Sequence, residues 1–80
     1  GRGRGVSKSP IGNHLRRLRF EHGEMSQEAL ARRVGITRQT VIAIEAGQYA
    51  PSLELAMRLA QVFARRVDDV FFWNETKEGS

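Results

Sequence analysis

Thr37, Arg38, Gln39 and Thr40 form the stretch of this sequence whose side chains are best suited to chemistry, with two hydroxyls, a guanidinium and a carboxamide in a row. An apolar pattern follows them as far as Gly47, so we expect them to form the first turn of a helix with Thr37 as its N-cap. One interpretation is a capped turn that faces solvent. The other is that Arg38 and Gln39 contact another molecule, because both carry strong hydrogen-bonding groups.

Residue patterns typical of catalytic or metal sites are missing from the sequence. There is no cysteine, and the only two histidines, His14 and His22, are eight residues apart rather than paired as zinc ligands. Asp68 and Asp69 are adjacent, which sends their carboxylates to different faces of a helix. The GRGRG segment does not follow a strand as a phosphate-binding loop does. The sequence therefore favours a binding protein without metal or cofactor over an enzyme.

The charge is unevenly distributed along the 80 residues, whose net charge is +4. Residues 1–38 carry nine basic and three acidic side chains, a charge of +6, whereas residues 39–80 carry four and six, a charge of −2. A basic half suits nucleic acid or an anionic membrane surface, although a solvated charged face has the same composition. No apolar run approaches the ~18 residues of a membrane span. We therefore expect a cytoplasmic protein that does not contact a membrane.

The hydrophobic pattern predicts one mostly helical domain over residues 9–74, between a flexible basic arm of residues 1–8 and a polar tail of residues 75–80. Hydroxyl caps and glycines set the expected helix ends. The expected helices run from Ser9–Pro10 to about Glu21, from Ser26 to Val34, from Thr37 to Gly47, from Ser52 to about Phe63, and around Asp68–Phe71. Ile11, Leu15 and Leu18 are the expected buried stripe of the first helix, and Leu53, Ala56, Leu59, Ala60 and Phe63 that of the fourth.

The second and third expected helices satisfy a demanding pattern of residue types. Counted from Gln27, the fourth, eighth, tenth, fifteenth and eighteenth residues are apolar, the fifth is alanine and the ninth is glycine: Leu30, Val34, Ile36, Val41, Ile44, Ala31 and Gly35. Two helices that cross at a steep angle must approach closely, which requires a small residue such as Ala31. The tight turn between them needs a residue at positive φ, which Gly35 supplies. The pattern therefore predicts a helix-turn-helix.

The segments LRRLRFEHG, MSQEALARRVGITRQTVIAIEAG and YAPSLELAMRLAQVF resemble the Xre/Cro-like family of helix-turn-helix transcriptional regulators, the phage lambda repressor type. The resemblance extends from about Ile11 to Phe72. It implies an all-α fold, a five-helix lambda-repressor-like DNA-binding domain with a short extended C-terminal segment. It also implies that the third helix lies in the major groove of double-stranded DNA.

Residue roles follow from the same resemblance. Arg38, Gln39 and Ala43 match positions that contact bases, where Arg pairs with guanine, Gln with adenine, and Ala offers only an apolar contact. Gln27, Thr37, Thr40 and Gln48 are the expected phosphate contacts, with a thymine methyl as an alternative for Thr40. Arg19 and Glu45 match a structural ion pair between the first and third helices.

Two further segments have alternative interpretations. Arg2 and Arg4 of the arm are candidates for an A·T-rich minor groove, but an untethered tail explains them equally well. Val70 and Phe71 are expected to close the core, whereas Phe72 and Trp73 are expected to meet a second subunit because they exceed what so small a core can hide.

The sequence therefore predicts a homodimeric, sequence-specific DNA-binding regulator, most simply a repressor of an inverted-repeat operator. The alternative is an antitoxin or protein-interaction adaptor with the same fold. Duplex RNA is less suited to such a helix, because its major groove is too narrow to admit one. A toxin or RNA polymerase as a protein partner is neither indicated nor excluded by the residues.

Overall fold

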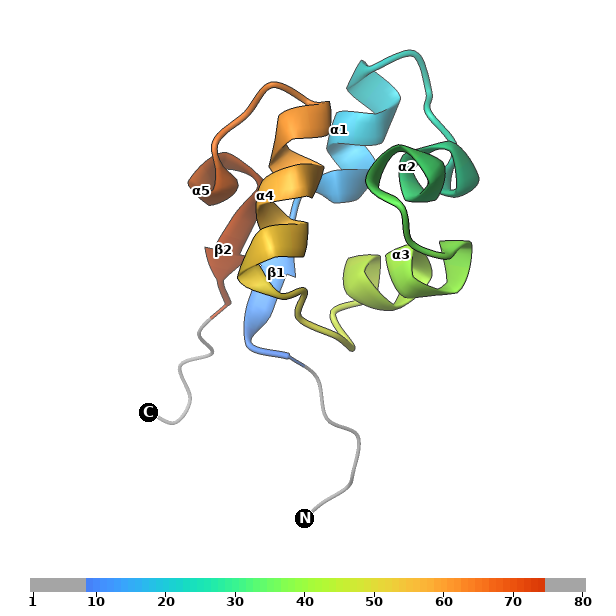
Figure 1. The fold of residues 1–80 in the computed structure, drawn as a ribbon. Coiled ribbons are helices and arrows are strands. Elements are labelled where there is room, and N and C mark those ends of the chain that lie inside the picture. Colours follow the sequence, from blue (N-terminus) through green and yellow to red (C-terminus); the bar gives the residue numbers. More distant parts are fainter. Residues whose placement is uncertain (1–8, 75–80) are drawn as a thin grey trace.

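A computed structural model of the chain describes residues 9–74, and Figure 1 shows its fold. The elements in chain order are β1 (Ile11–Asn13), α1 (Leu15–Glu21), α2 (Gln27–Val34), α3 (Arg38–Glu45), α4 (Leu53–Val62), α5 (Val67–Val70) and β2 (Phe71–Trp73). The five helices surround one apolar core, and β1 and β2 lie side by side as a small sheet (Figure 1). The expected five-helix architecture is confirmed. The expected arm, with Arg2 and Arg4, and the expected tail lie outside the described residues.

Three hydroxyl side chains begin helices as predicted. Ser26 accepts a hydrogen bond from the backbone N–H of Ala29 at 3.0 Å, and Ser52 accepts one from Leu55 at 3.1 Å. Thr37 accepts one from the N–H of Thr40 at 3.2 Å. Each bond satisfies a donor that has no partner inside its own helix, so these short helices begin at defined residues.

The predicted helix-turn-helix forms between α2 and α3. Its apolar positions enter the core: Leu30, Ala31, Val34, Val41 and Ile44 are buried, and Ile36 packs partly buried against them. Gly35 ends α2 with φ +78°, and its N–H donates to the carbonyl of Ala31 at 2.9 Å. The turn thus depends on a left-handed residue at the point where the sequence supplies glycine.

The first helix begins later than predicted. Ser9 does not cap it; its hydroxyl accepts from the N–H of Ile11 at 3.0 Å, and residues 11–13 form β1. β1 pairs antiparallel with β2 in the register Ile11↔Trp73, Gly12↔Phe72 and Asn13↔Phe71. The all-α prediction missed this strand because its partner lies about 60 residues away in the sequence and no local pattern marks the pairing.

The fourth helix differs at one predicted core position. Leu53 is 70% exposed, whereas Ala56, Leu59, Ala60 and Phe63 are buried as predicted. Leu53 is the first residue of α4, and periodicity alone does not show whether another element covers the end of a helix. At the other end of the chain, Val70 and Phe71 are buried as expected, and Phe71 is already in β2.

The longest helix within residues 9–74 is α4, with ten residues. None of the described helices has the length and apolar character needed to cross a bilayer.

Gly35, in the turn between α2 and α3, allows the effect of backbone conformation on stability to be measured separately from the effect of packing. A Cβ added at Gly35 meets no atom within 4 Å, so Gly35→Ala introduces no clash and changes only the cost of the left-handed backbone. We expect Gly35→Ala to lower the free energy of unfolding by about 1–2 kcal/mol in urea titrations, and Gly35→Asn to lower it less, because Asn adopts this conformation more readily. A Gly35→Ala protein as stable as the parent would contradict this account of the turn.

Candidate nucleic-acid interface

A buried ion pair joins α1 to the end of α3. The Nε of Arg19 donates to Oε2 of Glu45 at 2.7 Å, and its Nη2 donates to Oε1 at 2.9 Å. The third donor, Nη1, reaches the carbonyl oxygen of Met25 at 2.9 Å. Arg19 is only 9% exposed. The pair expected between the first and third helices is therefore present as a bidentate contact through two guanidinium nitrogens, and the third nitrogen bonds the backbone.

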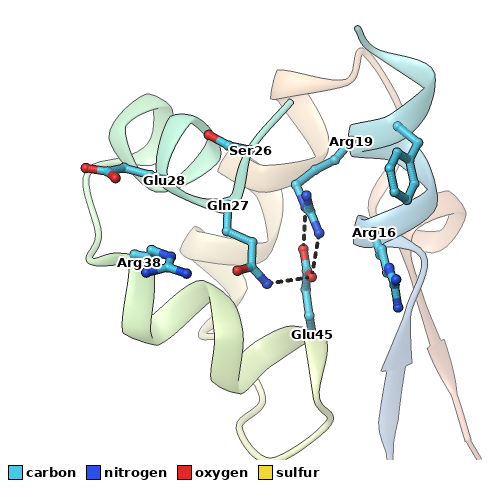
Figure 2. Close-up of a pocket in the computed structure, with 8 residues that line it drawn as sticks. Arg16, Arg19, Ser26, Gln27, Glu28, Arg38 and Glu45 are labelled. Atoms are coloured by element: carbon cyan, nitrogen blue, oxygen red, sulfur yellow. Dashed lines mark hydrogen bonds and ion pairs between the residues drawn. The ribbon is translucent and has the colours of Figure 1, made fainter. Parts of the chain in front are cut away.

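Gln27 connects the first residue of α2 to the same carboxylate. Its Nε2 donates to Oε1 of Glu45 at 3.1 Å, and Figure 2 shows Gln27 and Arg19 approaching Glu45 from two sides. Three helices thus meet at one carboxylate. The side-chain amide of Gln27, an expected phosphate contact, still has a second hydrogen for an external acceptor.

A groove of about 550 Å³ lies beside this ion pair. Its walls come from α1, the start of α2, and α3, and Figure 2 shows the side chains that line it. The lining residues are Arg16, Arg19, Phe20, Ser26, Gln27, Glu28, Arg38 and Glu45. Arg16 also lies with its guanidinium carbon 6.0 Å from the centre of the Phe20 ring, which fits a cation–π contact. From the sequence, Arg16 is part of a solvated face or, if it flanks the DNA groove, a further phosphate contact. The spacing of residues on α1 does not reveal the groove of the protein.

Two of the three expected base contacts are exposed at the start of α3, and the third, Ala43, is half-buried further along the helix. Arg38 and Gln39 are the first two residues of the helix, directly after the Thr37 cap. Neither side chain forms a hydrogen bond or ion pair with another residue in the part of the chain that the structure describes. The polar ends of these side chains are therefore available to an external partner.

The other expected contact residues surround this turn. The hydroxyls of Thr37 and Thr40 lie 3.0 Å apart and hydrogen-bond to each other. Gln48 is exposed in the loop after α3, and its backbone N–H donates to the carbonyl of Ala43 at 3.0 Å. The structure thus brings the expected phosphate contacts Thr37 and Thr40 to one end of α3 and Gln48 to the other.

A second hollow, of about 400 Å³, lies on the side of α3 that carries Gln39, Thr40 and Ala43. Its fourth lining residue is Tyr49, which follows α3 in the loop and is 47% exposed. The residue pattern predicts no DNA contact for Tyr49. Its position in a loop gives no periodic signal, and the turn after α3 brings it next to that helix.

The expected subunit contacts lie on β2. Phe72 is 40% exposed and Trp73 is 65% exposed. The ring centre of Phe72 lies 4.7 Å from that of His14, so Phe72 is partly held by its own chain. Within residues 9–74, β1 is the only strand paired with β2, which leaves the opposite edge of β2 without a strand partner there.

Acidic, histidine and cysteine side chains do not converge at this face. Across the described range of 9–74, no three such side chains gather closely enough to hold a metal ion. The chemistry that this face offers is hydrogen bonding, positive charge and a small apolar surface.

Comparison with protein families gives a match to the helix-turn-helix family over residues 15–70. Several relatives of similar length carry the name of uncharacterised transcriptional regulators of the helix-turn-helix type. One from Methanocaldococcus jannaschii is 43% identical over 79% of this chain and 94% of its own. YgzD of Bacillus subtilis is 48% identical over the same shares, and a protein of Methanothermobacter thermautotrophicus is 50% identical over 76% of this chain and 88% of its own.

Among solved structures, the chain is similar to a putative DNA-binding protein from Bacteroides fragilis, with a TM-score of 0.68 at 16% identity, over 78% of this chain and 98% of that one. This likeness shows a shared fold. The predicted lambda-repressor-like architecture is thereby confirmed.

The buried ion pair predicts a large difference between breaking it and replacing it. Glu45→Ala leaves the Arg19 charge buried without its partner, so we expect a loss of about 3–5 kcal/mol in the free energy of unfolding, measured with urea at low temperature. Replacing both residues, as Arg19→Met with Glu45→Leu, should recover most of that loss.

The exposed pair of Arg58 and Glu54 on α4, with atoms 2.9 Å apart, supplies the matched control. Glu54→Ala should change the free energy of unfolding by no more than about 0.5 kcal/mol. Equal effects of Glu45→Ala and Glu54→Ala would show that the buried pair does not hold the helices together.

Proposed function

This chain belongs to the helix-turn-helix family of transcriptional regulators, of the Xre/Cro-like type, and we propose that it is a homodimeric repressor that binds an inverted-repeat operator in the cytoplasm. In this proposal α3 enters the major groove, and the protein acts without catalysis or cofactor. Repression follows from occupying a promoter, which needs no further domain.

One observation carries the proposal. Arg38 and Gln39 stand exposed at the start of α3 without an internal partner in residues 9–74, on a helix whose other end is tied to α1 and α2 through Glu45. The alternative interpretation, a capped turn that faces solvent, explains the presence of Thr37 but not that of Arg38 and Gln39. A guanidinium and a carboxamide side by side on a rigid helix suit base edges, because Arg can bond guanine O6 and N7 and Gln can bond adenine N6 and N7.

Contacts with DNA phosphates would position α3 in the major groove of the DNA. Thr37 and Thr40 at its start and Gln48 after its end carry hydroxyl or amide groups at both ends of the helix. Arg16 of α1 supplies a further positive charge in the protein groove that Arg38 also lines. Such contacts give affinity and register but no base preference.

A dimer is proposed because one helix in one groove reads too few base pairs to select an operator. Phe72 and Trp73 expose aromatic surface on β2, and the edge of β2 away from β1 has no strand partner within residues 9–74. A second copy that packs on this strand would place two α3 helices about 10–10.5 bp apart on an inverted repeat.

The base contacts are tested by selecting bound sequences from random DNA with the 80-residue protein. The selected site is then compared with unrelated DNA in a fluorescence anisotropy competition. Arg38→Ala and Gln39→Ala should each lower the ratio of selected to unrelated affinity by about 5- to 150-fold, because each removes a bidentate base contact. Binding to unrelated DNA should persist.

Arg65→Ala is the matched charge control, since Arg65 follows α4 and pairs with Glu21 rather than facing α3. It should leave the preference for the selected site unchanged. A parent protein with no preference among DNA sequences would defeat the regulator proposal in favour of a protein-interaction adaptor or an antitoxin that does not read DNA.

The dimer is tested by sedimentation of the Phe72→Ser, Trp73→Ser double variant. We expect the parent chain to sediment at twice its 9.0 kDa mass and the variant at the monomer mass. Leu53→Ser with Met57→Ser is the matched control, because these residues on α4 are 70% and 50% exposed. If the dimer persists in the β2 variant, or is lost only in the α4 variant, the subunit interface does not lie on β2.

A further inference from the structure

Tyr49 occupies a defined place beside α3 although it follows the helix by four residues. The N–H of Gly47 donates to the carbonyl of Ile44, and that of Gln48 donates to the carbonyl of Ala43, both at 3.0 Å. With Gly47 at φ +77°, these bonds close the helix and turn the chain back along it. Tyr49 therefore lines one hollow together with Gln39, Thr40 and Ala43.

The chemistry of this hollow differs from that of the groove beside the ion pair. The groove is lined by three arginines and two glutamates, whereas the hollow contains no charged side chain. Ala43 contributes a methyl group, Tyr49 an aromatic ring, and Gln39 a carboxamide that can both donate and accept. An apolar wall thus adjoins a donor–acceptor pair, in a hollow of about 400 Å³ that is open to solvent.

One edge in the major groove of DNA has the matching combination. An A·T pair presents the N7 acceptor and N6 donor of adenine together with the C5-methyl group of thymine, which is the only apolar group that the four base pairs expose there. A phosphate would gain no positive charge from the four lining residues.

We propose that the hollow receives the C5-methyl group of one thymine in each operator half-site, with Tyr49 and Ala43 as its apolar walls and Gln39 bonded to an adenine of the same half-site. This inference rests on the proposed function and adds a specificity-determining residue outside α3. Tyr49 then contributes by excluding water from the methyl group, rather than through its hydroxyl.

The test replaces each thymine of a selected half-site in turn by deoxyuridine, which removes the methyl group and keeps every hydrogen-bonding group of the base. For the parent protein we expect one thymine whose replacement weakens binding about four-fold, the effect of burying one methyl-sized group. The other replacements should have smaller effects. Fluorescence anisotropy at constant salt measures each affinity.

Tyr49→Ala and Tyr49→Phe separate the ring from the hydroxyl. The alanine variant should bind the thymine and deoxyuridine sites with equal affinity, whereas the phenylalanine variant should keep the four-fold difference. Circular dichroism should show both variants folded, because Tyr49 lies outside the helices and is 47% exposed.

Three results would overturn the inference while leaving sequence-specific binding intact. These are no sensitivity to any thymine methyl in the parent, the same sensitivity in Tyr49→Ala as in the parent, and loss of the sensitivity in Tyr49→Phe. The proposed function itself fails only if the selection from random DNA yields no preferred site, so the two failures are distinguishable.

Discussion

The carboxylate of Glu45 is the point at which three helices are held together. Arg19 of α1 contacts it through two nitrogens, and Gln27 at the start of α2 donates to the same oxygen as one of them. Since Glu45 is the last residue of α3, this network fixes the end of that helix opposite Arg38 and Gln39. Buried charges tolerate little displacement, because separation leaves each without solvent or partner. The exposed first turn of α3 is thus presented on a support with little freedom to move.

The two sides of α3 carry side chains of different chemistry. On one side, the groove beside the ion pair is bounded by Arg16 of α1 and by Arg38. On the other, Tyr49 returns to the helix and forms an uncharged hollow with Ala43. In the proposed function, Arg16 would contact the phosphate backbone, whereas Arg38 and the small apolar surface beside Gln39 would contact base edges.

The small sheet connects the ends of the described chain and shapes the surface proposed for a second subunit. β1 is held on one side by β2 and on the other by the end of α3, where the side chain of Asn13 donates to the carbonyl of Ile44 at 2.9 Å. Within residues 9–74, the edge of β2 opposite β1 has no strand partner. Phe71 turns into the core and Phe72 to the opposite face, as expected for alternation along a strand, whereas Trp73, on the same side as Phe71, is exposed at the end of β2.

The sequence by itself determined the features that depend on local chemistry. The hydroxyl caps, the glycine at positive φ and the apolar spacing of α2 and α3 each act within a few residues, so the helix-turn-helix and most of its core were predictable. The place of Tyr49 is set by the turn after α3, which no periodic pattern predicts. The exposure of Leu53 and the strand at residues 11–13 were decided by the tertiary structure, because each depends on which distant segment lies alongside, as with Ile11 opposite Trp73, and residue periodicity does not show such a neighbour.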